Sequence, residues 1–335
     1  MTSRDRVINT VFHKASAQIP TLLTIPPEVY QFRREECDEL RVRFASDLEF
    51  LDYRFSGEKA AAASDSFFTD AWGCFWKKTP GGFSPEESFS LLDGIHDLKS
   101  LSPPKTPVFS SEIENIAESC ENNSRFLILQ SGIHPFRRLL ALLGREETLS
   151  AIRQKSPELR TFLKRLHEYY INQLRQWCTA PVDAVCIGDD WADESGLFFP
   201  ADIWEDLFLP MIAEYGEILK SHDKFVYFTS AGNIQQLMPS LITAGVDVVR
   251  YNDSAVNTSR LAAAYSGAIT LHIIMDDART ERISDKEISE KILAIRRAAG
   301  ESGGVIAECR MSADVPLRNI SGTILNWKRR MPVEF

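Results

Sequence analysis

The chain has 335 residues, of which 44% are hydrophobic and 25% are charged, and its formal net charge is -9 at pH 7. No apolar run approaches the roughly 18–20 residues that a membrane-spanning helix needs. Acidic and basic residues are interleaved, without the basic patch of a nucleic-acid-binding protein. The opening MTSRDRVINTVFHK lacks the apolar core of a secretory signal. We therefore expect a cytoplasmic protein that binds neither membranes nor nucleic acid.

Six short apolar or β-branched runs have the pattern of buried strands, and segments with helical periodicity stand between them. The runs are RFLILQ (125–130), DAVCIG (183–188), KFVYFT (224–229), VDVVRY (246–251), AITLHIIM (268–275) and GGVIAEC (303–309). Alternation of strands with helices predicts a parallel sheet with helical crossovers, an α/β fold. The GxGxxG sequence typical of an open dinucleotide-binding sheet is absent, which favours a closed (β/α)8 TIM-type barrel.

We expect a single barrel domain over residues 1–335. Residues 121–335 carry the regular strand and helix repeats, whereas residues 1–120 are interrupted by Pro26-Pro27, TPGGFSPEES and LSPPKTP. Proline and glycine at this density are typical of loops. We interpret the first part as N-terminal extensions and entrance loops over the mouth of the barrel.

Functional side chains of such barrels come from the carboxyl ends of the strands. The strand DAVCIG is followed by four carboxylates, Asp189, Asp190, Asp193 and Glu194. Carboxylates this close together need a cation, basic side chains, helix amides or shared protons. We expect Asp189 and Asp190 to be catalytic and Glu194 to contact the substrate. A helix cap or a solvent-facing loop explains Asp193 and Glu194 equally well.

Polar residues at other strand ends extend the predicted site. His134 follows RFLILQ and is a candidate acid, base or ligand. His272 lies within its strand, where a buried core histidine is as expected as a functional one. The side chains predicted to contact the substrate at other positions are Tyr227, Thr229, Asn252, Asp276, Arg310 and Trp72. Trp72 belongs to DAWGCFW, which is typical of a pocket wall or of a structural plug.

Several segments together resemble the uroporphyrinogen decarboxylase-like superfamily, which also contains methyltransferases that serve corrinoid proteins and coenzyme thiols. The matching segments are SRDRVINTVFHK, DAWGCFW, IGDDWADESGLFFPADIWEDLFLP, KFVYFTSAGNIQQLMPSLITAGVDVV and GGVIAECRMSADVPLRNI. Their order and spacing cover nearly the whole chain. The resemblance implies a (β/α)8 barrel with its site at the carboxyl ends of the strands.

The chain departs from the zinc-dependent methyltransferases of this superfamily, which carry a His-x-Cys pair just before a glycine and a distant cysteine. Alignment on Gly232 places that pair at Thr229 and Ala231, and leaves Cys309 as the only ligand position that is kept. Zinc needs sulfur and nitrogen ligands, so this set disfavours zinc. The six cysteines also form no CxxC pair, which indicates reduced thiols. We expect no tightly bound metal or cofactor.

The leading hypothesis is a small-molecule methyltransferase that moves a methyl group from an O- or N-methylated substrate to a corrinoid on a partner protein. Zinc is dispensable when the acceptor is Co(I) rather than a thiol. One alternative is a cofactor-independent decarboxylase in which Arg54, Arg137 or Arg310 holds a carboxylate and Asp190 protonates the carbanion. The other is a barrel that binds a ligand without catalysis. A homodimer is also compatible with the sequence.

Overall fold

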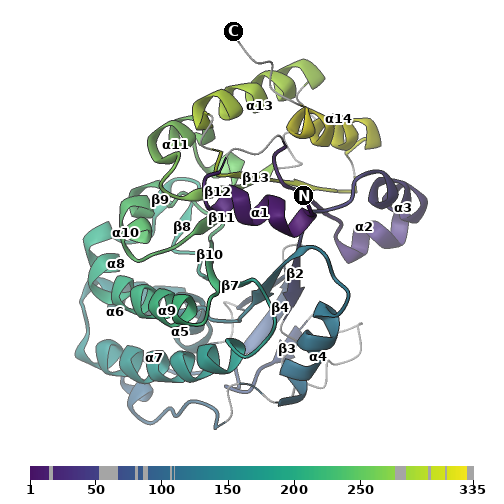
Figure 1. The fold of residues 1–335 in the computed structure, drawn as a ribbon. Helices are drawn as coiled ribbons and strands as arrows, with labels where there is room; N and C mark the ends of the chain where they lie inside the picture. The colour runs from purple at the N-terminus through teal and green to yellow at the C-terminus, as the bar shows by residue number, and fades with distance from the viewer. Residues whose placement is uncertain are drawn as a thin grey trace.

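The computed structural model describes residues 1–14, 18–52, 67–79, 82–85, 90–105, 108, 110–275, 284–300, 303–313 and 315–329. Within these residues, eight strands form one sheet (Figure 1). They are β1 (Thr21–Thr24), β2 (Leu48–Asp52), β6 (Phe126–Gln130), β7 (Ala184–Gly188), β10 (Phe225–Thr229), β11 (Val248–Asn252), β12 (Thr270–Met275) and β13 (Val305–Arg310).

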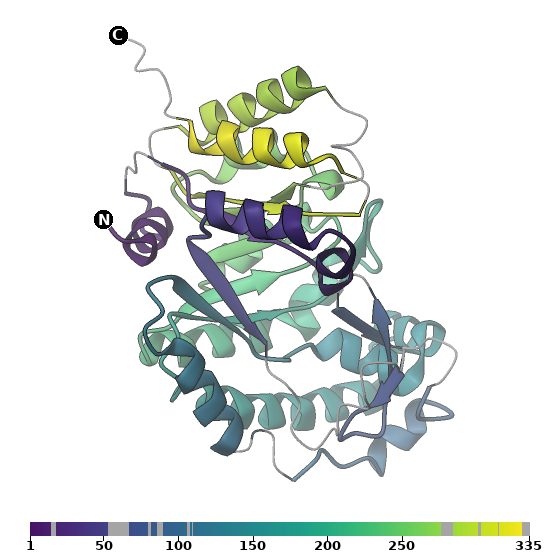
Figure 2. The same ribbon diagram turned by 90° about the vertical axis from the view of Figure 1, so that its right-hand side faces the viewer.

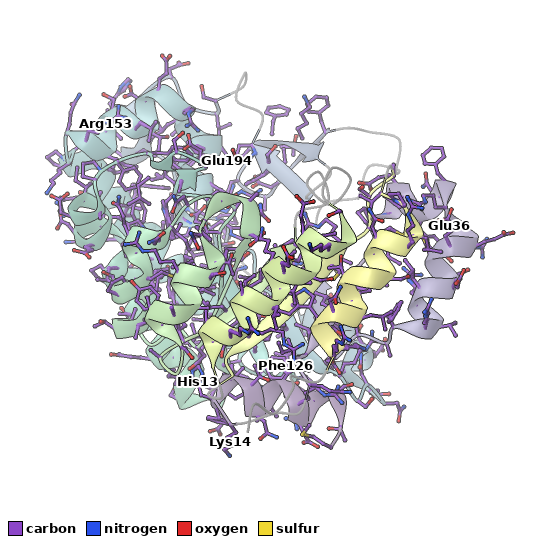
Figure 3. All side chains as sticks on the ribbon, turned by 90° about the horizontal axis from the view of Figure 1, so that it is seen from above. His13, Lys14, Glu36, Phe126, Arg153 and Glu194 are labelled. Atoms are coloured by element: carbon purple, nitrogen blue, oxygen red, sulfur yellow. The ribbon has the colours of Figure 1, made fainter. Side chains whose placement is uncertain are left out.

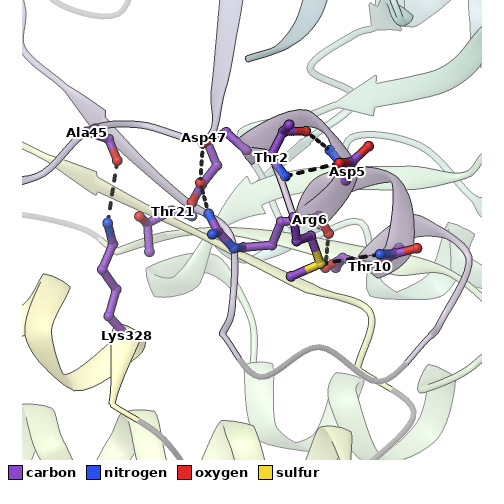
Figure 4. Close-up of polar contacts among 11 residues, drawn as sticks. Thr2, Asp5, Arg6, Thr10, Thr21, Ala45, Asp47 and Lys328 are labelled. Carbon is purple, nitrogen blue, oxygen red and sulfur yellow. Dashed lines mark hydrogen bonds and ion pairs between the residues drawn. The ribbon is translucent and has the colours of Figure 1, made fainter. Parts of the chain in front are cut away.

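The eight strands are arranged as a barrel. Their order is β1-β13-β12-β11-β10-β7-β6-β2, and every neighbouring pair is parallel. Asp47, which precedes β2, links the two ends of the sheet: its N–H donates to the Thr21 carbonyl at 2.9 Å, and its carboxylate accepts from the Thr21 N–H at 2.9 Å (Figure 4). The predicted (β/α)8 TIM-type barrel is confirmed.

Helices surround the sheet and connect successive barrel strands (Figure 1). They are α1 (Ser3–Val11), α2 (Pro27–Phe32), α3 (Arg34–Arg43), α4 (Ser110–Cys120), α5 (Pro135–Leu143), α6 (Arg145–Arg153), α7 (Pro157–Trp177), α8 (Ala201–Leu207), α9 (Leu209–Ser221), α10 (Met238–Thr243), α11 (Thr258–Tyr265), α13 (Asp285–Ala299) and α14 (Leu317–Lys328), with short 3-10 turns η1 (Ile95–Lys99), η2 (Gln235–Leu237) and η3 (Asp253–Ala255). No helix among the described residues is long and apolar enough to cross a membrane.

Helix α1 closes the amino end of the barrel. Val7 and Val11 of α1 pack into one apolar cluster with lumen residues such as Leu22 and Ile306. Arg6 pairs with the Asp47 carboxylate (Figure 4), so the same carboxylate binds α1 and β1. Figure 2 shows α1 on the side of the barrel opposite to the small sheet β3 (Phe67–Thr69), β4 (Phe75–Thr79) and β5 (Gly82–Pro85).

A buried ion pair fastens this small sheet to α5. Asp70 accepts hydrogen bonds from the N–H groups of Trp72 and Cys74, both at 2.9 Å, and from Trp76 Nε1 at 2.8 Å. It also pairs with Arg138 of α5, and the two side chains are only 1% and 5% exposed. The rings of Trp72 and Trp76 lie 4.9 and 5.3 Å from the guanidinium. DAWGCFW is therefore a structural anchor.

The first 120 residues contribute more to the barrel than the sequence pattern indicated. The strands β1 and β2 both lie there, with only four and five residues, and neither was among the six predicted runs. Runs this short in a segment rich in proline and glycine carry little periodicity. In addition, α1 covers the amino end of the barrel, whereas the sheet β3–β5 packs on α5, which begins just after the carboxyl end of β6.

Replacing Asp70 by Asn should destabilise the fold by about 3–5 kcal/mol, because Arg138 would keep a buried charge without a counter-ion. Urea unfolding followed by tryptophan fluorescence measures this change. The control is Lys286→Ala, which removes an exposed pair at 3.8 Å from Glu290 and should cost well under about 1 kcal/mol. Equal effects of the two variants would contradict the anchoring role of Asp70.

Candidate active site

The mouth of the barrel, defined as the carboxyl ends of its eight strands, carries a group of polar side chains. Side chains alternate along a strand between the lumen and the surrounding helices. Tyr227, Val248 and Ile306 belong to the lumen cluster, so Thr229, Arg250 and Glu308 face the lumen nearer the mouth. Figure 3 shows Glu194, which follows β7, on the side of the molecule opposite to His13, Lys14 and Phe126 at the amino end.

Glu308 is the centre of a polar cluster in the lumen. Its side chain is fully buried, and its carboxylate accepts from Arg250 Nε at 2.7 Å and from Arg250 Nη2 at 2.9 Å. Thr24 Oγ1 donates a third hydrogen bond at 2.9 Å. Burial opposes the ionised form, but Arg250 outweighs burial and holds the pKa of Glu308 well below its usual range. The carboxylate is therefore ionised and fixes the guanidinium.

His272 and Tyr227 support Glu308 from below. Both are fully buried, and the Tyr227 hydroxyl forms a short hydrogen bond with His272 Nδ1. His272 Nε2 lies 3.2 Å from Glu308 Oε2. Burial lowers the pKa of His272, so the ring is neutral at pH 7. A neutral ring that accepts the tyrosine proton at Nδ1 carries its own proton on Nε2, which lies near the carboxylate but makes no hydrogen bond within the described residues.

A second guanidinium approaches the same carboxylate. Arg310 Nη2 lies 3.6 Å from Glu308 Oε1, and the Arg310 side chain is 32% exposed. The Arg250 side chain is 18% exposed, and its guanidinium lies 4.9 Å from the centre of the Phe50 ring. Glu308 therefore pairs closely with one guanidinium and, at a longer distance, with a second.

Sequence reasoning predicted Arg310 and Tyr227 as substrate contacts, left His272 open, and missed Glu308 and Arg250. A signal for the missed pair was present, because each is a charged residue within an otherwise apolar strand run. Charged residues are almost never fully buried unless they are paired. Such residues on two different strands predict a buried ion pair, although the sequence does not reveal which strands are neighbours.

Asp189 fixes the start of α5. Its carboxylate accepts hydrogen bonds from the N–H groups of Phe136 and of Arg137, the latter at 3.0 Å, and the residue is 2% exposed. Burial, with Asp190 beside it, raises the pKa of Asp189 to about 8, against the opposing effect of Arg137. Both oxygens are thus engaged in capping the helix, and Asp189 positions the β6–α5 connection.

Asp190 and Asn252 hold the turn after β10, residues 229–233. The N–H of Ala231 donates to Asp190 Oδ1 at 2.8 Å, and Asn252 Nδ2 donates to the Ala231 carbonyl at 3.5 Å. The Thr229 carbonyl accepts from the Asp189 N–H at 3.1 Å. Side chains at the ends of the two strands that flank β10 therefore bind the peptide groups of this turn, which makes the turn a fixed part of the mouth.

Gly232 lets the hairpin β8 (Ala192–Asp193) and β9 (Gly196–Leu197) lie directly on this turn. A β-carbon at Gly232 would be 2.1 Å from the Ala192 carbonyl oxygen. The N–H of Asn233 donates to the Asp193 carbonyl at 2.8 Å, which ties the hairpin to the turn. The close backbone approach explains the glycine independently of any ligand.

His134 lies at the N-cap of α5, beside the mouth. Its Nδ1 is 2.6 Å from the Gly188 carbonyl, which can only accept, so Nδ1 carries the proton. Burial, with Arg137 nearby, lowers the pKa of His134 to about 4. The neutral ring therefore keeps a lone pair on Nε2, which makes no hydrogen bond within the described residues.

The remaining predicted contacts lie apart from the Glu308 cluster. Glu194 is exposed at the tip of the β8–β9 hairpin, and Asp193 caps that tip by accepting from the Ser195 N–H at 2.8 Å. Trp72 is 8% exposed and packs on Arg138 away from the lumen. Asp276 lies outside the described residues.

The ligand positions of the zinc-dependent relatives do not form a zinc site in this chain. Thr229 and Ala231 offer neither sulfur nor imidazole. Cys309 is 3% exposed and belongs to the cluster between sheet and helices, on the face of β13 opposite to Glu308. Over the described part of the chain, no three His, Cys, Asp or Glu side chains are grouped to hold a metal ion.

Gly232→Ala should destabilise the protein by roughly 1–3 kcal/mol, because either the turn or the hairpin must move away from the new methyl group. Gly322→Ala is the matched control: apart from its chain neighbours and the adjacent backbone of α14, no described heavy atom lies within 4 Å of its β-carbon position. A glycine within a helix costs about 0.5–1 kcal/mol, so this change should stabilise. Chemical unfolding measures both, and a neutral Gly232→Ala variant would argue against the close contact.

The free energy of unfolding should fall on acidification partly through His134. Its pKa is about 4 in the folded protein against an ordinary 6.5, so the unfolded chain binds a proton first. The stabilising contribution is therefore complete above pH 6.5 and is lost towards pH 4, by at most about 3 kcal/mol. His134→Asn should flatten the pH dependence of urea unfolding in this range. His96→Asn, at an exposed histidine, should not.

Comparisons with known proteins agree with this architecture. A family model described as Uroporphyrinogen decarboxylase (URO-D) matches residues 86–324, which is 239 of the 335 residues. A methyltransferase from Methanosarcina mazei has a similar structure, with a TM-score of 0.70, 13% identity and coverage of 98% of both chains.

Lower similarity is found to an endo-β-1,4-xylanase from Gloeophyllum trabeum (TM-score 0.47, 9% identity, 93% of this chain and 97% of that one). Similarity at this level is also found to the C-terminal domain of a putative chitinase from Desulfitobacterium hafniense (TM-score 0.46, 10% identity, covering 93% of this chain and 99% of that one). These two similarities carry no functional argument. No significant match was found among curated protein sequences. The family match covers more than half of the sequence, and the chain belongs to the uroporphyrinogen decarboxylase (URO-D) family.

Proposed function

We propose that the protein is a small-molecule methyltransferase that passes a methyl group from an O- or N-methylated substrate to a corrinoid carried by a partner protein. Family membership and the similar fold of a methyltransferase support an enzyme of this type. The observation that carries the proposal is the replacement of sulfur and imidazole ligands by Thr229 and Ala231, with Arg250, Glu308 and Arg310 facing the same mouth.

The residues at the mouth favour an acceptor that needs no activation by the enzyme. A thiol becomes nucleophilic as the thiolate, which zinc coordination stabilises, and Thr229 and Ala231 are not zinc ligands, nor do the described residues group three side chains for a metal ion. A Co(I) corrinoid is already a strong nucleophile. In the transfer, the bond between the methyl carbon and the substrate heteroatom breaks and leaves its electron pair on the heteroatom, while the corrinoid supplies the electron pair of the new bond.

The chain itself contributes binding and charge. The fixed turn at residues 229–233 forms one side of the mouth. On the side of β6, the neutral His134 ring offers a hydrogen-bond acceptor. Asp189 and Asp190, which we expect to be catalytic, accept hydrogen bonds from the N–H groups of Arg137 and Ala231 and so hold α5 and the turn in place. Preorganised groups of this kind need no rearrangement during the reaction.

A cofactor-independent decarboxylase is the second candidate, and the cations at the mouth are the observation that favours it. Arg250 and Arg310 are suited to hold a substrate carboxylate. Arg137 lies with its guanidinium 5.7 Å from the Trp76 ring, and Arg54 lies outside the described residues. Cations next to the carboxylate that is lost would stabilise the reactant, which makes methyl transfer the better explanation.

Wild-type protein incubated with methylated donors and reduced free cobalamin should form methyl–cobalt, detected by its visible absorption. Arg310→Gln should lower this rate about 100-fold, as the loss of one preorganised donor typically does. Arg318→Gln, at an exposed arginine on α14, is the matched control and should leave it unchanged. Release of CO2 from small carboxylic acids without any methyl–cobalt signal would favour the decarboxylase instead.

A further inference from the structure

We propose that the Arg250 and Arg310 half of the mouth is an oxyanion-binding subsite, so that the methyl group is removed from oxygen rather than from nitrogen. This inference rests on the proposed function for its chemical meaning, but the binding site itself does not require it. The subsite would hold the carboxylate or phenolate oxygen that remains after demethylation.

The first support is the free edge of Arg250. Its Nε and Nη2 are bound to Glu308 at 2.7 and 2.9 Å, whereas Nη1 makes no hydrogen bond within the described residues. The lumen below is filled by the apolar cluster with Val7 and Val11 of α1. The 18% of the Arg250 side chain that is exposed therefore opens towards the carboxyl ends of the strands.

The second support is the rigidity of this edge. A guanidinium presents its N–H groups in a fixed plane. Glu308 determines the position of the Arg250 plane, and the guanidinium carbon lies 4.9 Å from the centre of the Phe50 ring. Thr24 Oγ1 also donates to this carboxylate at 2.9 Å, and the buried His272 ring lies beside it, so the carboxylate itself is held in place. The cation is therefore oriented before a ligand arrives.

The third support is the charge balance. Glu308 is fully buried and saturated by Arg250 and Thr24, so it offers no anion to a positively charged ligand. Arg310, 3.6 Å from the same carboxylate and 32% exposed, adds a second cation. The half-site would attract an anion and repel a quaternary ammonium group. Negative charge that develops on a leaving oxygen would be stabilised here during C–O cleavage.

Binding of small aromatic probes of different charge tests the subsite without turnover. Isothermal titration at pH 8.5 would compare benzoate and 4-nitrophenolate, as carboxylate and phenolate anions, with 4-nitroanisole and trimethylphenylammonium. At least one of the two anions should bind at least 10-fold more tightly than the neutral ether, and the cation should not bind. Binding of one anion only would identify the class of oxygen. Equal or tighter binding of trimethylphenylammonium would overturn the proposal.

Variants assign the binding to the two arginines. Arg250→Gln and Arg310→Gln should each weaken anion binding at least 10-fold, and Arg318→Gln should not change it. Arg250→Gln leaves the buried Glu308 without its main partner and risks misfolding, so Arg310→Gln, at a partly exposed position, is the decisive variant. Unchanged affinity in folded Arg310→Gln would contradict the subsite.

Turnover separates this inference from the proposed function. Arginine-dependent anion binding without methyl–cobalt formation from 4-nitroanisole, methyl benzoate or any other methyl donor would leave the subsite standing and refute the methyltransferase. Methyl transfer from trimethylphenylammonium but not from the O-methyl compounds would support the methyltransferase and refute the oxygen leaving group.

Discussion

The arrangement of polar side chains at the mouth of this barrel depends on one buried carboxylate. Glu308 is completely removed from solvent, and an uncompensated charge in that position would cost several kcal/mol. Its compensation comes from three other strands, through Thr24 of β1, Arg250 of β11 and His272 of β12. Because Glu308 contacts side chains from several strands, it fixes the relative positions of those strands. It also fixes the Arg250 guanidinium, which it binds directly.

Ionised and neutral groups are separated in this lumen. Below Glu308, burial keeps His272 and Tyr227 uncharged, and the layer beneath them is apolar and closed by α1. Above Glu308, Arg250 and Arg310 are partly exposed. Charge thus increases from the closed end towards the open end.

The barrel could be predicted from the sequence because each barrel strand from β6 onwards is an apolar run between helices. The strands β1 and β2 show no such pattern. The site was harder for a physical reason. Asp189 and Asp190 were predicted as catalytic because they follow a strand, and the sequence does not reveal the backbone N–H groups of other segments that their carboxylates accept from. The pairing of Arg250 with Glu308 joins β11 and β13, which β12 separates in the sheet, and no local pattern encodes that contact.

The closure of the amino end by α1 imposes an order of events on any reaction at the mouth. With Val7 and Val11 filling one end of the lumen, the proposed substrate would enter and leave at the mouth. The corrinoid-carrying partner that we propose would approach through that same opening. The substrate would therefore enter before the partner docks, and the demethylated product would leave only after the partner withdraws or tilts. Dissociation of the partner, rather than the chemical step, then becomes a natural limit on the turnover rate.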